Sequence, residues 1–352
     1  MSNPLAVLVL LATLLLSIGI YLYTFRPSTR SSLNASAKPA AAAADDIIPV
    51  SVNYFFTRHC NAECGFCFHT ETSSYKLPLD KACEGLRLLA KDGMEKVNFA
   101  GGEPFLYPKY LGELCRYCKE DLKLPSVSIV SNGTKVTEKW LREFGPFVDI
   151  LAISCDSINP ETNAAIGRAD RGSGKPFDNV GKLFEIRDWC MLYGVRFKLN
   201  TVVCSLNWNE DMSEMVEQLG PFRWKVFQVL VVKGQNDGDK RKRDATKFIV
   251  TDEQYQEFCR KHEHLKCMIP EPNSSMKSSY LLIDEYMRFL DKGDGEEKVS
   301  DSILEVGVQK AIKQVRWDQE EFRKRGGVYD WSKLTETTGG CSGAAAIKNL
   351  EW

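Results

Sequence analysis

The chain has 352 residues, of which 43% are hydrophobic, and its formal net charge is −1. This length suits one large domain or two small ones, and the hydrophobic content suffices for a full core. A charge so close to zero excludes bulk electrostatic attraction to nucleic acid. Most of the twelve cysteines sit singly in apolar contexts, which indicates buried free thiols in a reducing compartment and not a disulfide framework.

Residues 1–30 differ in kind from the rest of the chain. The stretch Leu5–Tyr23 is nearly all apolar, and no charged side chain precedes Arg26. About 20 such residues span a bilayer, and the basic region and small residues of a cleaved signal peptide are not evident. We expect a membrane anchor that spans the bilayer, with an interfacial helix as the alternative. Arg26 and Arg30 then keep the rest of the protein on the cytosolic side, and residues 31–46, rich in Ala and Ser, form a flexible linker.

Three cysteines, Cys60, Cys64 and Cys67, lie on one short segment with the spacing C-x3-C-x2-C. A 4Fe–4S cluster normally takes four cysteines, so three leave one iron open to bind a further ligand. The alternative is a structural zinc site, which needs a fourth ligand that His59 or His69 could supply. The number of ligands favours the iron–sulfur interpretation over zinc.

Apolar, β-branched runs alternate with helix-like stretches from residue 47 to residue 290. Strands followed by helices imply a parallel sheet, and right-handed crossovers curl such a sheet into a barrel or partial barrel. Active sites of these folds gather at the carboxyl ends of the strands, and the cysteine segment follows the first strand. The expected strands are Val50–Phe56, Lys96–Ala100, Ser126–Ser131, Asp149–Ser154, Arg196–Val203 and Trp224–Val232, and the expected helices are Leu79–Asp92, Tyr110–Leu122, Glu138–Phe144, Val180–Tyr193 and Glu210–Leu219.

The segment Ala100-Gly-Gly-Glu-Pro104 directly follows the second expected strand. Two glycines let a backbone edge approach a ligand closely, and Glu103 offers a carboxylate for an ammonium group. Alone this is a common turn, but after a C-x3-C-x2-C segment it is a specific signal.

Three other clusters are expected to be structural. The second C-x2-C, formed by Cys115 and Cys118, lies in a helix without a partner pair for a metal site. The run Lys240–Arg243 is expected to be a solvated loop and not a nucleic-acid patch. His262 and His264 lie in a polar helix and are expected to face water.

The cysteine spacing, followed by the aromatic Phe68, resembles the signature of the radical S-adenosylmethionine (SAM) superfamily, and the Gly-Gly-Glu motif resembles that superfamily's SAM-binding motif. Longer segments are similar to the viperins within it, from about residue 47 to the end. These segments are Ser51–Arg58, Cys64–Thr70, Gly93–Phe105, Val127–Gly133, Val148–Ser157, Arg223–Gln228, Asp284–Leu290, Lys324–Ser332 and the closing Leu-Glu-Trp.

The resemblance implies a partial (βα)6 barrel with one 4Fe–4S cluster, whose open iron is chelated by SAM. An electron from the cluster splits SAM into methionine and a 5′-deoxyadenosyl radical. Viperins convert CTP to 3′-deoxy-3′,4′-didehydro-CTP, an antiviral chain terminator, so we expect a pyrimidine nucleoside triphosphate dehydratase with CTP as first substrate and UTP as the close rival. A peptide-modifying radical SAM enzyme and a non-catalytic membrane scaffold are the alternatives.

The resemblance also implies a role for individual residues. The cluster ligands are Cys60, Cys64 and Cys67, and the SAM-contacting positions are Phe68, Gly101, Gly102, Glu103, Ser154 and Arg168. The nucleotide-binding positions are Asn53, Lys96, Lys198, Asn200, Arg223 and Lys225, and Tyr280 assists hydrogen or proton delivery at the ribose. Any one of the cations alone would be an ordinary strand-edge charge, but four on strands of one barrel suit a triphosphate.

Residues 291–352 are expected to be a C-terminal extension that covers the active site. The last three residues, Leu350, Glu351 and Trp352, resemble the tail by which viperins recruit the cytosolic iron–sulfur assembly machinery. The catalytic domain is expected on the cytosolic face of the endoplasmic reticulum membrane, where an electron donor must reach it. Vertebrate viperins carry an amphipathic helix at the N-terminus, and the spanning segment expected here departs from that pattern.

Overall fold

The computed structural model describes residues 46–333, except 176, 178, 277, 278, 292–297 and 330. The chain divides into two compact units, Met1–Ala42 and Ala43–Trp352, and the described residues belong to the second. The expected anchor, almost all of the expected linker and the C-terminal tail lie outside the described residues. Among the helices that are described, none has the length and apolar character needed to cross a membrane.

Ten strands form one sheet within the described part of the chain, in the order β10-β9-β8-β1-β2-β3-β4-β5-β6-β7. The seven strands from β1 to β7 pair in parallel in their sequence order, and β8 pairs in parallel with β1 on the other side. The strands are β1 (Ser51–Phe55), β2 (Lys96–Ala100), β3 (Ser126–Ser131), β4 (Ile150–Ser154), β5 (Arg196–Val203), β6 (Arg223–Gln228), β7 (Met268–Glu271), β8 (Leu281–Ile283), β9 (Arg288–Asp291) and β10 (Lys298–Ser302). The predicted α/β fold with a central parallel sheet is confirmed.

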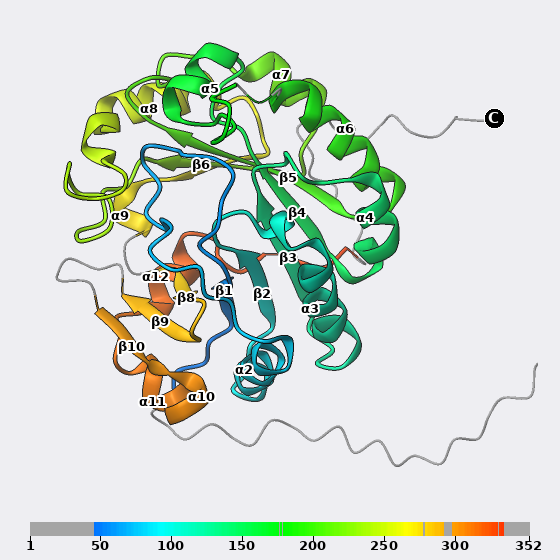
Figure 1. Ribbon diagram of the computed structural model, residues 1–352. Helices are drawn as coiled ribbons and strands as arrows, with labels where there is room; N and C mark the ends of the chain where they lie inside the picture. The colour runs from blue at the N-terminus through cyan, green and yellow to red at the C-terminus, as the bar shows by residue number, and fades with distance from the viewer. Residues whose placement is uncertain are drawn as a thin grey trace, which may run out of the picture. The chain divides into compact units, whose positions relative to one another are not determined.

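Helices connect the parallel strands and run along the outside of the sheet (Figure 1). Their ends follow local capping chemistry. Thr137 accepts a hydrogen bond from the Trp140 amide at the start of α4, and Thr251 begins α8 with a reciprocal capping box. The helices are α2 (Leu79–Lys91), α3 (Pro108–Glu120), α4 (Glu138–Phe144), α5 (Pro160–Ile166), α6 (Asn179–Leu192), α7 (Ser213–Leu219), α8 (Asp252–Lys261), α9 (Asn273–Met276), α10 (Ile303–Val306), α11 (Val308–Ile312) and α12 (Gln319–Lys324).

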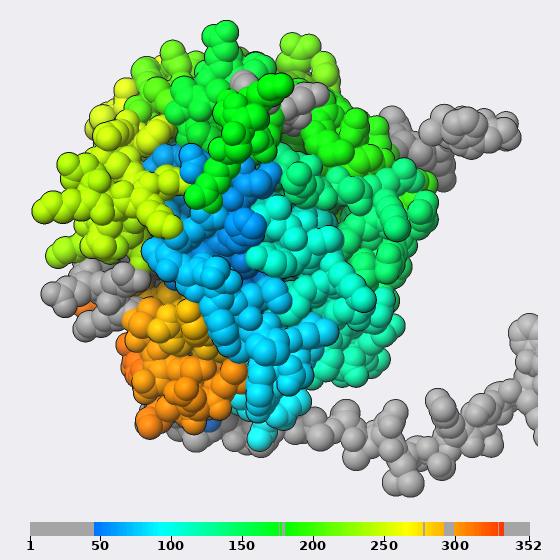
Figure 2. Space-filling view, viewed as in Figure 1, coloured from blue at the N-terminus to red at the C-terminus, as the bar shows by residue number. Residues whose placement is uncertain are grey.

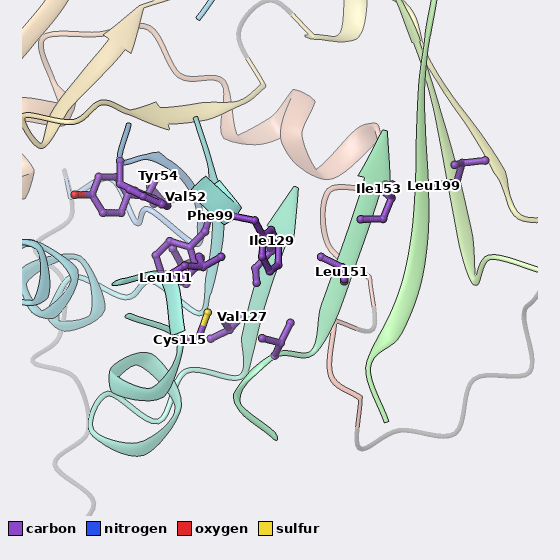
Figure 3. Packing of buried hydrophobic residues seen from close by; sticks show 14 of the residues in the cluster. Val52, Tyr54, Phe99, Leu111, Cys115, Val127, Ile129, Leu151, Ile153 and Leu199 are labelled. Carbon is purple, nitrogen blue, oxygen red and sulfur yellow. The ribbon is translucent and has the colours of Figure 1, made fainter. Parts of the chain in front are cut away.

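The outer face of the sheet is apolar and packs against these helices. Tyr54 and Phe99 from neighbouring strands are fully buried there, together with Leu111 of α3. Figure 3 shows this layer, in which Cys115 of α3 lies among the aliphatic side chains of β1 to β4. Cys115 and Cys118 are both free and fully buried, so the second C-x2-C is part of the core, as predicted.

The inner face of the same strands is polar. Asn53 of β1 pairs with Asn98 of β2, and Lys198 of β5 pairs with Arg223 of β6. Side chains alternate between the faces of a strand, so residues in register point to the same side. The polar residues of successive strands therefore line the inside of the partial barrel, where a ligand and not an apolar core must satisfy them.

The prediction that His262 faces water is wrong. His262 caps the C-terminus of α8 and is fully buried, whereas His264 is half exposed. The amide of Met212 donates to Nε2 of His262 at 2.9 Å, and Nδ1 lies 2.7 Å from the carbonyl oxygen of Phe258. Burial lowers the pKa of His262, which keeps the ring neutral and the two nitrogens in distinct roles.

Candidate active site inside the partial barrel

The cysteine segment, residues 57–70, begins just after β1 and lies against the turn that follows β2. The amide of Gly102 donates to the Thr57 carbonyl, and the amide of Glu103 donates to the His59 carbonyl, both at 2.8 Å. A Cβ atom on Gly101 or Gly102 would collide with those carbonyls, and Gly101 also has a φ of +134°. The two glycines therefore permit close contact between two backbone segments of the protein itself, and their contact with SAM stays a prediction.

The three thiols lie close enough to influence one another. Burial raises the pKa of Cys60 to about 12 and that of Cys64 to about 11, and the neighbouring Cys67 adds to both increases. Metal loading must therefore release protons from these thiols. Arg168 acts in the opposite direction on Cys64 and Cys67, and Arg243 does so on Cys67.

The residues present fit an iron–sulfur cluster in donor type and in charge. Three thiols come from one loop, and three guanidinium groups, those of Arg168, Arg243 and Arg58, offset the negative charge of thiolates. In the described part of the chain, no three His, Cys, Asp or Glu side chains already stand in metal-binding geometry. Of the two histidines considered as a fourth zinc ligand, His59 is exposed with Nδ1 3.3 Å from the Tyr107 hydroxyl, and His69 is buried with its ring 4.7 Å from that of Phe55.

Glu103 is buried beside the cysteine segment. Its Oε1 accepts hydrogen bonds from the Phe105 amide at 3.0 Å and from the Ser131 hydroxyl at 2.7 Å, and its Oε2 accepts from the Asn132 amide at 2.7 Å. A carboxylate has about four acceptor positions, so these three bonds leave about one for an ammonium group. Burial raises the pKa of Glu103, and the three donors lower it.

Arg168 is held by a residue that sequence reasoning missed. Its Nε donates to Oδ2 of the fully buried Asp156, while Oδ1 of Asp156 accepts from the Val202 amide at 2.9 Å. Asp156 follows Ser154, the last residue of β4, by two positions. The two other SAM-contacting candidates also lie at this end: Ser154 is partly buried, and Phe68 packs edge-on against Phe55 with ring centroids 6.1 Å apart.

A chain of polar side chains crosses the inner face of β1, β2 and β3. Asn98 donates to Oδ1 of Asn53 at 2.9 Å, and Ser128 donates to Oδ1 of Asn98 at 2.9 Å. Asn53 in turn donates to the Leu281 carbonyl of β8 at 3.2 Å. On the opposite side, Asn200 is buried and its Oδ1 has no hydrogen-bond partner among the described residues. Asn98 and Ser128 join the two predicted asparagines and were missed by sequence reasoning.

The four predicted cations line the inner face nearer the amino ends of the strands. Lys96 and Arg223 are the first residues of β2 and β6, and Lys198 and Lys225 are the third residues of β5 and β6. Burial lowers the pKa of Lys96 to about 7 and that of Lys225 to about 8, and it lowers the pKa of Lys198 as well. The like charges of Lys225 and Arg223 lower the pKa values of Lys96 and Lys198 further, and those of Arg325 and Arg223 lower the pKa of Lys225.

Glu271, the last residue of β7, lies among these cations and was not foreseen. Its side chain is buried, and Oε1 accepts from Lys225 Nζ and, at 3.3 Å, from Arg325 Nη1. The Tyr280 hydroxyl lies 2.8 Å from Lys225 Nζ, and the guanidinium of Arg325 lies 3.8 Å from the centre of the Tyr280 ring. Burial raises the pKa of Tyr280, so its hydroxyl keeps its proton at neutral pH.

The segment after α12 returns along the same end of the barrel (Figure 1, orange-red). The Tyr329 ring lies 4.2 Å from the Arg223 guanidinium and 5.3 Å from Lys96 Nζ. The carbonyl of Trp331 accepts from the Ser126 hydroxyl at 3.3 Å, and the carbonyl of Ser332 accepts from Arg196 at 3.0 Å. Residues from the C-terminal extension thus contribute aromatic and cationic groups to the cation cluster.

The structure sorts the predicted residues into two groups. One group surrounds the cysteine segment at the carboxyl ends of the strands, and the other lines the inner face toward the amino ends. Along β2, Lys96 and Gly101 are five residues apart, which corresponds to roughly 16 Å of extended chain. An elongated ligand along the inner face would contact both groups. The predicted tail residues Leu350, Glu351 and Trp352 lie outside the described residues.

Comparison with known proteins gives consistent findings. The sequence model of the radical SAM superfamily matches residues 54–242. The chain is 52% identical over 287 residues to "S-adenosylmethionine-dependent nucleotide dehydratase RSAD2" of Oncorhynchus mykiss, covering 81% of each chain. It is 50% identical over 310 residues to the protein of the same name from Danio rerio, covering 88% of this chain and 85% of that one. It is also 35% identical over 294 residues to an S-adenosylmethionine-dependent nucleotide dehydratase of Flammeovirga pacifica, covering 82% of this chain and 97% of that one.

Two solved structures share the fold at low sequence identity. SuiB of Streptococcus suis bound to S-adenosylmethionine has a TM-score of 0.54 and 14% identity, covering 79% of this chain and 68% of that one. The structure of anSMEcpe with bound AdoMet has a TM-score of 0.57 and 14% identity, covering 78% of both. At this level of identity the likeness concerns the fold alone.

Proposed function

Because the chain belongs to the SAM-dependent nucleotide dehydratases of the radical SAM superfamily, we propose that it dehydrates a pyrimidine nucleoside triphosphate. The proposed substrate is CTP, with UTP as the rival, and the product is the 3′-deoxy-3′,4′-didehydro analogue. The observation that carries this proposal is the cluster of buried cations on the inner face of the sheet. Among the described residues, Glu271 pairs with Lys225 and with Arg325 of the C-terminal extension, whereas Lys96, Lys198 and Arg223 have no ion-pair partner.

That charge imbalance suits a polyanion. Buried charges are costly unless they are paired, and burial accordingly lowers the pKa values of Lys96 and Lys225. A triphosphate would restore the missing negative charge, and each charge-assisted hydrogen bond would contribute about 1.5–3 kcal/mol. A peptide substrate would give no comparable reason for so many cations, and no observation in the structure favours one.

The remaining residues are proposed to orient the two reactants. When bound, the cluster and SAM supply the 5′-deoxyadenosyl radical that removes the C4′ hydrogen of the ribose. Glu103 and Arg168 would hold SAM, with Ser154 and Phe68 beside it. Asn53 and Asn200 would hydrogen-bond the nucleoside, since the buried Oδ1 of Asn200 has no partner in the described part of the chain. Positioning of this kind is the main contribution a protein makes to such a step.

Tyr280 is proposed to serve the loss of the 3′-hydroxyl group. That group leaves as water after it takes up a proton, and one further electron completes the product. The Tyr280 hydroxyl stays protonated and lies within hydrogen-bond distance of Lys225 Nζ. Lys225 can therefore return a proton to Tyr280 after a transfer, because its own pKa is about 8.

Three further proposals concern the two ends of the chain, of which residues 1–45 and 334–352 lie outside the described residues. Residues 1–30 would anchor the protein in the endoplasmic reticulum membrane with the catalytic domain in the cytosol. Residues 291–352 would cover the active site, and this is supported by the contacts of Tyr329 with Arg223 and Lys96. The last three residues would recruit the cytosolic iron–sulfur assembly machinery.

An anaerobic assay with dithionite, SAM and a panel of nucleoside triphosphates tests the proposed function. We expect 5′-deoxyadenosine and a nucleotide product 18 mass units lighter than CTP, the mass of water lost, on the order of one product per SAM cleaved. Replacement of Lys198 or Arg223 by Ala should weaken CTP binding at least tenfold, equivalent to about 1.4 kcal/mol. Equal turnover of CMP and CTP would contradict a triphosphate site.

A further inference from the structure

The connection between β6 and α8 packs against the cysteine segment. Asn236 is fully buried and donates through Nδ2 to the Phe66 carbonyl at 2.7 Å. The Phe248 ring stands perpendicular to the Phe66 ring, with centroids 6.0 Å apart, and fills the space beside Gly65. In Figure 2 the yellow-green atoms of this connection adjoin the blue atoms of the cysteine segment. The connection therefore forms the solvent-facing border of the cluster site.

This border is strongly basic, although the chain as a whole is not. Residues 233–247 contain six basic and three acidic side chains, against a net charge of −1 for all 352 residues. Asp237 pairs with Arg241 at 3.4 Å, and Asp244 pairs with Lys247 at 3.4 Å. Lys233, Lys240 and Lys242 are exposed, and none of the described residues forms an ion pair with them. These three positive charges face solvent, and the exposed Asp239 is the one acidic side chain of this stretch outside the two ion pairs, so positive charge remains in excess.

A second basic element lies on the other side of the cysteine segment. The Arg171 amide donates to the Asn61 carbonyl at 3.0 Å, and its guanidinium pairs with Glu63 and Glu71. Glu63 also pairs with Arg243 at 3.4 Å, so the one exposed carboxylate between Cys60 and Cys64 is already neutralised from both sides. Lys175, on the same turn as Arg171, is exposed.

Exposed apolar residues adjoin the basic border. The Ser205 amide donates to the Phe248 carbonyl at 3.0 Å, which brings the neighbouring residues Leu206 and Ile249 to the same region of the surface. Leu206 is 43% exposed and Ile249 is 53% exposed. Apolar contacts surrounded by charged residues are the usual composition of a protein–protein interface. We call Lys233, Lys240, Arg241, Lys242, Lys247 and Lys175 the basic rim.

We propose that the basic rim docks an acidic electron-carrier protein, of the small flavin or iron–sulfur kind, beside the cysteine segment. This inference rests on the proposed function, because that function requires electrons from outside the protein. The docked carrier is oxidised by one electron and the cluster is reduced by one, with no bond made or broken and no proton exchanged between them. Complementary charge would speed the encounter and fix the orientation of the two proteins.

Recombinant flavodoxin, an acidic flavin protein, serves as the probe. The test variant carries Lys240→Glu, Arg241→Glu and Lys242→Glu. The control variant carries Lys310→Glu, Lys313→Glu and Arg316→Glu, which makes the same change in net charge at exposed positions in and just after α11, elsewhere on the protein. Binding of oxidised flavodoxin to each reconstituted full-length protein is measured by biolayer interferometry at low and high NaCl. This readout does not depend on catalysis.

We expect the test variant to bind flavodoxin at least tenfold more weakly than the wild type at low salt, and the control variant to bind within twofold of it. Added NaCl should weaken wild-type binding, because exposed charges are screened. Production of 5′-deoxyadenosine driven by reduced flavodoxin should fall in the test variant, whereas production driven by dithionite should be unchanged. If the wild type produces no 5′-deoxyadenosine even with dithionite, that result counts against the proposed function and not against the docking proposal.

Two results would overturn the docking proposal. One is equal flavodoxin binding by the test and control variants. The other is a test variant that keeps flavodoxin binding but loses binding to vesicles containing phosphatidylserine, relative to the wild type with the same N-terminal segment. That second result would make the basic rim a surface for anionic lipid.

Discussion

Replacement of Glu271 by Gln tests whether the interior is short of negative charge in the absence of nucleotide. Glutamine has nearly the same shape, so the change removes a charge and leaves the packing intact. Lys225 and Arg325 would lose their shared ion-pair partner, which is 1% exposed in the structure. Breaking a buried ion pair by removing one partner costs about 3–5 kcal/mol.

The lower end of that range applies here. Lys225 can release its proton, since burial already lowers its pKa to about 8. Arg325 cannot release a proton, and it therefore carries most of the cost, which we put at about 3 kcal/mol. For a domain of this size 1 kcal/mol corresponds to roughly 2 °C in Tm, so we expect the variant to melt about 6 °C below the wild type.

Nucleotide should reverse the effect. A triphosphate that occupies the interior supplies the charge that the carboxylate provided, so CTP or inorganic tripolyphosphate should raise the Tm of the variant more than that of the wild type. Scanning calorimetry with and without the anion measures both shifts. The control is Glu113→Gln, because Glu113 pairs with Arg116 on the exposed side of α3 at 3.0 Å, where a change of less than about 0.5 kcal/mol is expected. An unchanged Tm for Glu271→Gln, or equal stabilisation of variant and wild type by tripolyphosphate, would refute the reasoning.

The other predictions concern the cluster, pH and the two ends of the chain. Cys64→Ala should abolish both iron binding and SAM cleavage, and stoichiometric zinc without iron uptake in the wild type would contradict the cluster assignment. The affinity for CTP should fall as pH rises from 7 to 9, because Lys96 and Lys225, with pKa values of about 7 and 8, must be protonated to bind it. Calorimetry in two buffers should detect proton uptake on binding. An affinity that rises with pH would exclude this explanation. The protein should stay in the membrane pellet after alkaline carbonate extraction, whereas release would indicate a peripheral helix. Deletion of the last three residues should lower the iron content in cells and leave chemically reconstituted activity intact, and unchanged cellular iron would show that the tail is not a recruitment signal.

Local patterns in the sequence were sufficient to predict the existence of the first six strands and the position of the cysteine segment after the first of them. Three strands, β2, β3 and β5, have the predicted bounds, because polar and apolar residues largely alternate along each of them. The sixth was extended too far: β6 ends at Gln228, and Val232 is buried in a loop where its amide donates to the Asn236 side chain at 2.7 Å. The apolar residues of this buried loop therefore gave it the sequence pattern of a strand.

The missed features depend on contacts between distant parts of the chain. Glu271 meets Lys225 across 46 positions and Arg325 across 54. It ends a four-residue strand that contains Pro270, a residue that usually argues against strand structure. His262 was misjudged for the same reason, since its helix is polar by composition and its burial comes from Met212 and Trp224 of other elements. No local pattern reports such contacts.

The outer face of the sheet contributes to stability, whereas the inner face determines which ligand is bound. Tyr54 and Phe99 on the outer face lie in the buried core cluster with residues of α2 and α3, and replacing either with Ala would cost about 3–5 kcal/mol of stability. Asn98 and Ser128, on the inner face of β2 and β3, form hydrogen bonds with one another, with Asn53 and with the Val97 carbonyl. Inner-face positions can therefore change without disturbing the layer that holds the barrel together. A scaffold built in this way can acquire a new substrate through a few substitutions inside the barrel, while the apolar residues that stabilise the fold remain unchanged on the outer face.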